Sequence, residues 1–106
     1  MRLNDWQKLN MDRSAKAFPE CDDWSLNDWS GALCGEVGET ANKLKKVRRR
    51  GPGMELTEEE RRDFASEIGD AASYLAILAG KMGLSLEDCC RTAWQKVNER
   101  KGYSVP

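Results

Sequence analysis

The sequence predicts an all-α fold, a four-helix bundle in a single domain covering residues 1–106. Apolar residues recur at spacings of three and four along three long segments, which is the pattern of a helix with one buried face. No window alternates apolar and polar residues with a period of two, so we expect no sheet. The segments are separated by short stretches that contain glycine or proline, and these suit the turns of a helix bundle.

The first two helices are expected over about residues 4–17 and 26–50. The first ends before Pro19, because the residue preceding a proline is disfavoured in a helix. Its apolar positions are sparse, which suits a helix lying over the bundle. Either Ser25 or Asn27 caps the second helix. That helix closes with three arginines and the breaker at residues 51–53. Its apolar stripe consists of Leu26, Trp29, Leu33, Val37, Ala41, Leu44 and Val47.

The third and fourth helices both begin with a capping signal. Thr57 followed by Glu60 forms a capping box, and the helix it opens ends at Gly83. Ser85 with Asp88 opens the last helix, which runs up to residue 102. The stripe expected to be buried on the third helix consists of Phe64, Ile68, Ala71, Leu75, Leu78 and Met82.

Composition narrows the classes of function. The chain has no histidine, four cysteines and a formal net charge of -1. The absence of histidine excludes Ser-His-Asp and Cys-His catalysis and histidine-ligated zinc. The balanced charge gives no field that would draw the chain to nucleic acid, and no apolar run approaches the roughly 18 residues of a membrane span. We expect the cysteines to be free thiols in a reducing cytoplasm.

Two short acidic motifs carry the chemistry. The second helix contains Glu36 and Glu39, and the third contains Glu67 and Asp70. Residues three apart lie about 60° from each other on one helix face, so each pair of carboxylates can aim at one point. On both helices the acids border the apolar stripe. If the two helices pack antiparallel, four carboxylates meet at one rim.

A hard divalent cation would relieve the repulsion among these four anions. Magnesium takes oxygen ligands in octahedral geometry and usually keeps water and substrate phosphate in its shell. The alternative is an ordinary solvated acidic face, because one such pair is expected by chance among 18 acidic residues. Gly38 and Gly69 each stand inside a helix at a cost of about 1 kcal/mol relative to alanine, which suggests close approach of another group there.

From about Trp24 to Tyr103, the chain resembles the MazG-like branch of the all-α nucleoside triphosphate pyrophosphohydrolases. The resemblance rests on residues 35–39, 67–74, 84–87 and 96–101. That superfamily also contains the dimeric dUTPases and the dCTP pyrophosphatases. The resemblance implies a homodimer or a dimer-of-dimers tetramer. It also implies cleavage of a nucleoside triphosphate between its α and β phosphates, with Mg²⁺ as cofactor and Mn²⁺ as a substitute.

Residue by residue, the resemblance implies roles on three helices. It assigns the metal ligands as Glu36, Glu39, Glu67 and Asp70. Tyr74 matches an aromatic hydroxyl near the substrate, Asn98 matches a nucleotide contact, and Lys96 or Lys101 is expected to reach the phosphates. Many MazG proteins have a further glutamate where this chain has Gly35, so the number of bound metal ions stays open.

The catalytic base and the phosphate contacts are expected on the second helix. With no histidine, one motif carboxylate, Glu36 or Glu39, is expected to activate water, because its acidic neighbours can raise its pKa. Lys43 and Lys46 share the side of Glu39 and could reach the β and γ phosphates. The alternative for this basic run is a solvated helix end that compensates the helix dipole.

The tryptophans complete the predicted site. Trp29 falls on the apolar stripe and is expected in the core. Trp24 lies outside it and is a candidate either for stacking on the base or for packing at the helix entry. A competing reading of the whole chain is a catalytically inactive helical interaction module with a structural cation site.

Overall fold

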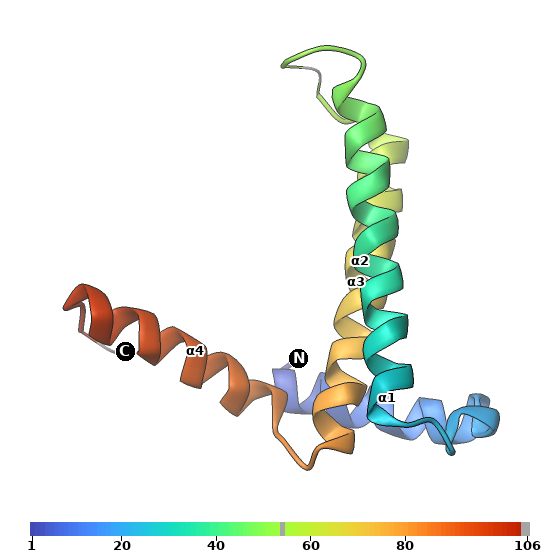
Figure 1. Ribbon diagram of the computed structural model, residues 1–106, viewed down its shortest axis with the longest axis vertical. Helices are drawn as coiled ribbons and strands as arrows, with labels where there is room; N and C mark the ends of the chain where they lie inside the picture. Colours follow the sequence, from blue (N-terminus) through green and yellow to red (C-terminus); the bar gives the residue numbers. More distant parts are fainter. Residues whose placement is uncertain (54, 105–106) are drawn as a thin grey trace. The chain divides into compact units, whose positions relative to one another are not determined.

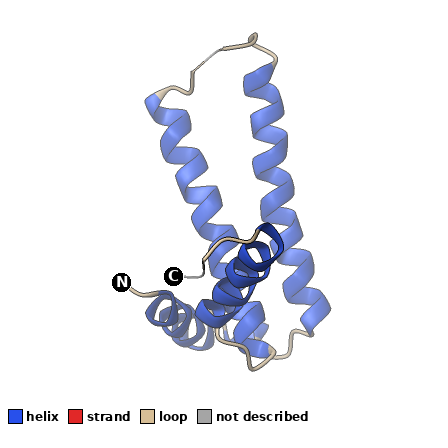
Figure 2. Cartoon of the chain, turned by 90° about the vertical axis from the view of Figure 1, so that its left-hand side faces the viewer, coloured by secondary structure: helices blue, strands red, loops and turns tan. Residues whose placement is uncertain are grey.

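The computed structural model describes residues 1–53 and 55–104, and all regular structure in them is helical. Four α-helices and one short 3-10 helix follow one another along the chain (Figure 1). Their bounds are α1 (Leu3–Ala17), η1 (Pro19–Cys21), α2 (Leu26–Arg48), α3 (Glu58–Lys81) and α4 (Leu86–Lys101). No strand occurs among the described residues (Figure 2). The all-α prediction is confirmed.

The chain divides into two compact units. One is Asp23–Leu75, which holds α2 and the larger part of α3, and the other is Met1–Asp22 together with the chain from Ala76 onward. The boundary between the units falls inside α3, which is one continuous helix. The single domain over residues 1–106 therefore stays a prediction.

In the unit 23–75, two capping boxes fix where the helices begin. Ser25, not Asn27, caps α2: its hydroxyl accepts from the Asp28 N–H at 3.2 Å, and the Asp28 carboxylate accepts from the Ser25 N–H at 2.8 Å. Thr57 and Glu60 make the same exchange at 3.1 and 2.9 Å. From these starts, α2 and the 58–75 part of α3 run side by side in opposite directions (Figures 1 and 2).

The other unit is organised around a buried glutamine on α1. Gln7 is 9% exposed, and its amide nitrogen donates to the carbonyls of Ala76 at 3.1 Å and Leu84 at 2.9 Å. Its amide oxygen accepts from the Leu86 N–H at 3.0 Å. The face of α1 that is buried is therefore polar, which explains why apolar positions on this helix are sparse.

The predicted buried stripes are wrong in part. Trp29 and Phe64 are buried as expected, at 3% and 7% exposure, but much of each stripe is not. The exposed positions are Leu26, Val37 and Leu44 on α2, Ile68 and Leu75 on α3, and Met82 immediately after α3. In the unit 23–75 each helix has a single helical neighbour, and one neighbour covers only one stripe of a helix surface.

All four cysteines are free thiols, as expected, and Cys34 and Cys90 are exposed. Among the described residues, none of the helices combines the length and apolar character needed to cross a membrane.

Candidate metal centre

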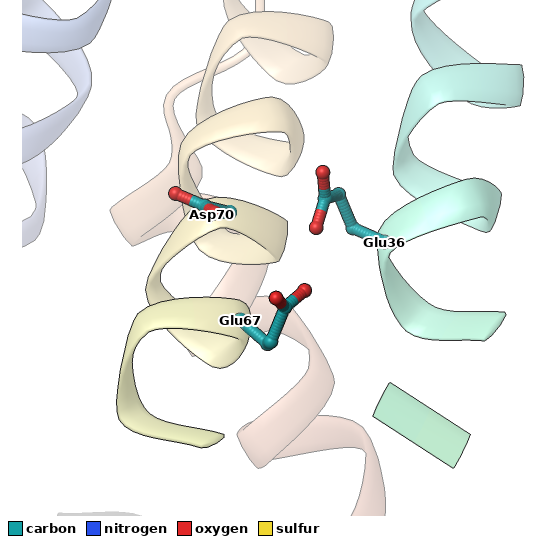
Figure 3. Close-up of side chains that lie close together, drawn as sticks. All are labelled: Glu36, Glu67 and Asp70. Carbon is teal, nitrogen blue, oxygen red and sulfur yellow. The ribbon is translucent and has the colours of Figure 1, made fainter. Parts of the chain in front are cut away.

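Three carboxylates from α2 and α3 converge in the unit 23–75. Glu36, Glu67 and Asp70 each offer one oxygen, and these oxygens all lie within 4.8 Å of one another. Figure 3 shows Glu36 reaching from α2 toward Glu67 on α3, with Asp70 on the same helix as Glu67. Glu39 is exposed and lies outside this three-carboxylate cluster, so the structure groups three of the four predicted ligands.

Burial differs among the three side chains. Glu67 is the most enclosed, with 15% of its side chain exposed, whereas Glu36 is half-buried and Asp70 is exposed. Burial of Glu36 raises its pKa, as do the hydrogen bond of its protonated form to Glu67 and the negative charges of Glu39, Glu67 and Asp70. The three carboxylates together thus hold more negative charge than their surroundings favour.

The donor set fits a hard divalent cation. With the carboxyls ionised, Glu67 Oε2 is buried and has no hydrogen-bond partner among the described residues. A buried, unpartnered carboxylate oxygen is costly, and a cation would satisfy it. Oxygens on opposite sides of an octahedral Mg²⁺ lie about 4.2 Å apart, so oxygens within 4.8 Å of one another need only small side-chain adjustments to share an ion.

Lys43 makes a contact that the sequence analysis missed. Its ammonium donates to Glu67 Oε1 at 3.0 Å and to Asp63 Oδ2 at 2.9 Å. Both hydrogen bonds raise the pKa of Lys43. Asp63 was not singled out, although its position four residues before Glu67 places both acids on one face of α3. Lys43 is thus engaged with carboxylates in this structure.

A basic groove runs beside the cluster in the same unit. It has a volume of about 370 Å³, and its lining includes the predicted phosphate contacts Lys43 and Lys46. The remaining lining residues are Val47, Arg50, Glu60, Asp63 and Phe64. Arg50 pairs with Glu60 at 2.8 Å. The groove therefore carries three cationic side chains and two acidic ones.

Three aromatic rings lie in contact one after another, from the start of α2 to α3. The rings of Trp24 and Trp29 lie 4.7 Å apart between centroids, and those of Trp29 and Tyr74 lie 6.2 Å apart. Trp29 is in the core, as predicted, while Trp24 is 36% exposed at the helix entry. The Trp29 indole N–H is buried without a hydrogen-bond partner among the described residues.

The predicted substrate contacts of α4 belong to the other unit. Asn98 is 8% exposed, and its backbone carbonyl accepts from the Tyr103 N–H at 2.9 Å. Lys96 borders a hollow of about 530 Å³ on the same helix, and Lys101 is exposed. Their nucleotide and phosphate contacts stay predictions.

The two motif glycines have no close neighbours in the described chain. A Cβ built on Gly38 or Gly69 meets nothing within 4 Å. The close approach suggested by the sequence is therefore not made within the described part of this chain. The structure gives no packing reason for either glycine.

The fold and the cluster define an all-α protein in which three carboxylates converge between two antiparallel helices. Residues 27–104 match the MazG nucleotide pyrophosphohydrolase domain. The chain belongs to the MazG nucleotide pyrophosphohydrolase family.

The chain is similar to the Gene 37 protein of Mycobacterium phage L5, with 38% identity over 73 residues. The match covers 69% of this chain and 63% of that protein, so the chain spans less than two thirds of this relative. No solved structure matches the chain.

Proposed function

We propose that this chain hydrolyses a nucleoside triphosphate between its α and β phosphates, giving a nucleoside monophosphate and pyrophosphate. The observation that carries the proposal is the convergence of Glu36, Glu67 and Asp70 within 4.8 Å in a MazG family member. Lys43 contributes one positive charge at Glu67, which leaves the three carboxylates with an excess of negative charge, and a divalent cation that arrives with the triphosphate would offset it. The proposed role is housekeeping of the nucleotide pool in the cytoplasm, which agrees with four free thiols.

The proposed metal is Mg²⁺, with Mn²⁺ as a substitute, and its ligands are Glu36, Glu67 and Asp70, with Glu39 as the fourth. When bound, such an ion neutralises the charge that develops on the pyrophosphate leaving group. Glu39 is exposed one helical turn from Glu36, which suits it to hold and deprotonate the attacking water. Glu36 is the alternative base, because its pKa is raised.

The chain offers further groups for the rest of the nucleotide. We propose that Lys46, and Lys43 if it leaves its carboxylate partners, contacts the phosphates from the groove. Trp24 and Tyr74 flank the buried Trp29 and are proposed to hold the base. Asn98, with Lys96 or Lys101, is proposed to contact the nucleotide. These roles rest on the family resemblance and on where the residues lie on their helices.

We further propose that the protein acts as a homodimer or a dimer of dimers. Large apolar side chains on α2 and α3 remain exposed in the single chain, among them Ile68 at 61% and Val37 at 53%. Burial of such residues against a second copy would recover hydrophobic stabilisation that one chain leaves unused.

One assay tests the enzymatic proposal. Purified protein is expected to release pyrophosphate from at least one member of a panel of canonical and damaged nucleotides, and only with Mg²⁺ or Mn²⁺. The Asp70→Asn variant is expected to lose turnover by a factor of 10² or more while its circular dichroism stays helical, because Asp70 is an exposed ligand and not part of the core. Glu39→Gln is a second inactive control.

Two results would count against this reading. Release by the wild-type protein no greater than by Glu39→Gln would leave an inactive module with a structural cation site as the better account. Unfolding of Asp70→Asn would show that the residue is structural.

A further inference from the structure

Lys43 bridges two acids on the facing helix and occupies one oxygen of the most buried one. Its ammonium lies 3.0 Å from Glu67 Oε1 and 2.9 Å from Asp63 Oδ2. Asp63 and Glu67 are one turn apart on α3, so the cation sits between them. Asp63 is half exposed, at 50%, whereas Glu67 is 15% exposed. Asp63 therefore acts as the outer anchor of Lys43, and Glu67 receives it at the buried end.

In this arrangement the two Glu67 oxygens have different surroundings. Oε1 is committed to an ammonium, while Oε2 is buried and, with the carboxyls ionised, has no hydrogen-bond partner among the described residues. Oε2 is thus the oxygen available to a metal ion. The Lys43 ammonium on Oε1 repels a metal ion that would chelate both oxygens, because chelation would bring the ion close to the ammonium.

The number of oxygens that a carboxylate donates distinguishes metals. Mg²⁺ demands six ligands in near-ideal octahedral geometry at about 2.1 Å, whereas Ca²⁺ takes six to eight oxygens and accepts bidentate carboxylates. A site whose most buried carboxylate is held to one oxygen matches the smaller ion. Removal of the ammonium would free the second oxygen for the larger one.

We propose that Lys43, anchored by Asp63, is a positioning residue that keeps Glu67 monodentate and so makes the site select Mg²⁺ or Mn²⁺ over Ca²⁺. The proposal rests on the metal centre of the proposed function. It assigns Lys43 to the metal site, and Lys46 alone remains as the lysine of the groove for phosphate. Nothing in this role requires that Lys43 touch the substrate.

The test measures metal binding in the absence of nucleotide. Free Mn²⁺ is followed by its electron paramagnetic resonance signal as it is titrated into the full-length protein, and Ca²⁺ affinity is obtained by displacement of bound Mn²⁺. The proteins compared are the wild type, Lys43→Met, Asp63→Asn and, as a matched control in the same groove, Lys46→Met. Circular dichroism establishes that each variant is folded.

Lys43→Met is expected to lower the ratio of Mn²⁺ to Ca²⁺ affinity about tenfold, the usual scale for loss of a group that orients a metal ligand. Asp63→Asn, which retains the ammonium but loses its anchor, is expected to lower the ratio by a smaller factor and serves if Lys43→Met does not fold. Lys46→Met is expected to leave the ratio unchanged.

Three results would overturn the proposal, and they are distinguishable. If the wild type binds Mn²⁺ and both the Lys43 and the Asp63 variants keep both of its affinities, the proposal fails while the metal centre stands. If Lys43→Met tightens Mn²⁺ and Ca²⁺ equally, Lys43 is a substitute cation that any metal displaces. If the wild type binds no divalent ion, the metal centre itself fails, and this inference with it.

Discussion

At the scale of single residues, Glu60 links the start of α3 to the turn that follows α2. Its carboxylate accepts from the Thr57 N–H at 2.9 Å and from the Arg50 guanidinium at 2.8 Å. These two contacts, the backbone one first, lower the pKa of Glu60 below its ordinary value of 4.5. A carboxyl with a lowered pKa stabilises the folded state above the pKa of the unfolded chain, and this contribution is lost as the pH falls through the folded value.

We therefore predict that Glu60→Gln flattens the acid side of the stability profile. The wild type is expected to lose stability below pH 4.5, the ordinary pKa of this carboxyl, more steeply than the variant does. Urea midpoints followed by circular dichroism between pH 3 and 7 measure the difference. Glu58→Gln, which removes another first-turn charge from α3, is the matched control. Parallel curves for the wild type and Glu60→Gln would contradict the prediction.

The carboxylates of the candidate site could be predicted from the sequence, whereas the contacts of Lys43 could not. Glu36, Glu67 and Asp70 were identified because spacing along a helix fixes which side chains share a face. The Lys43 contacts were not predicted, because they depend on which turn of α2 faces which turn of α3. Helical periodicity sets the face of each residue but leaves the sliding of one helix along another undetermined. That same offset brings Glu36 to the acids of α3 and leaves Glu39 outside the cluster.

At the scale of elements, Gln7 holds the turn between α3 and α4. Its three hydrogen bonds tie α1 to Ala76 in the last two turns of α3, to Leu84 in the turn, and to Leu86, the first residue of α4. We predict that Gln7→Met, which keeps the length of the side chain, lowers the free energy of unfolding by about 2–4 kcal/mol. The cost arises because two carbonyls and one buried N–H lose their partner.

Chemical denaturation of the two proteins measures this loss. Lys8→Ala is the control on the next position of the same helix, where an exposed pair with Asp12 contributes at most about 0.5 kcal/mol. A Gln7→Met protein as stable as Lys8→Ala would show that the three hydrogen bonds have little net effect on folding.

The helix starts could be predicted from the sequence, whereas the role of Gln7 could not. The capping residues Ser25, Thr57 and Ser85 were recognisable because a cap is a local interaction, complete within four residues. Gln7 was not, because an apolar pattern identifies only apolar burial. A polar side chain can be buried when distant backbone groups satisfy it, and those partners lie about 70 to 80 residues away in the chain.

At the scale of the whole molecule, exposed apolar residues are the main departure from the predicted stripes. Val37 and Leu44 on α2 and Ile68 on α3 are each about half or more exposed, at 53%, 48% and 61%. Their spacing was read correctly as a helix face, but the sequence does not say whether its own chain or a second copy covers that face. In the homo-oligomer proposed above, a second copy covers that face.

The proposed homo-oligomer can be tested by its mass. The wild-type protein is expected to run at a multiple of its 12.0 kDa chain mass in size-exclusion chromatography with light scattering. Ile68→Glu is expected to shift it toward the single-chain mass, because a charge cannot be buried unpaired in an apolar interface. Ser66→Glu adds the same charge two residues away, on nearly the opposite side of α3, and is expected to leave the mass unchanged. A wild-type mass of 12.0 kDa, or an Ile68→Glu protein that keeps the wild-type mass, would place the interface elsewhere or remove it.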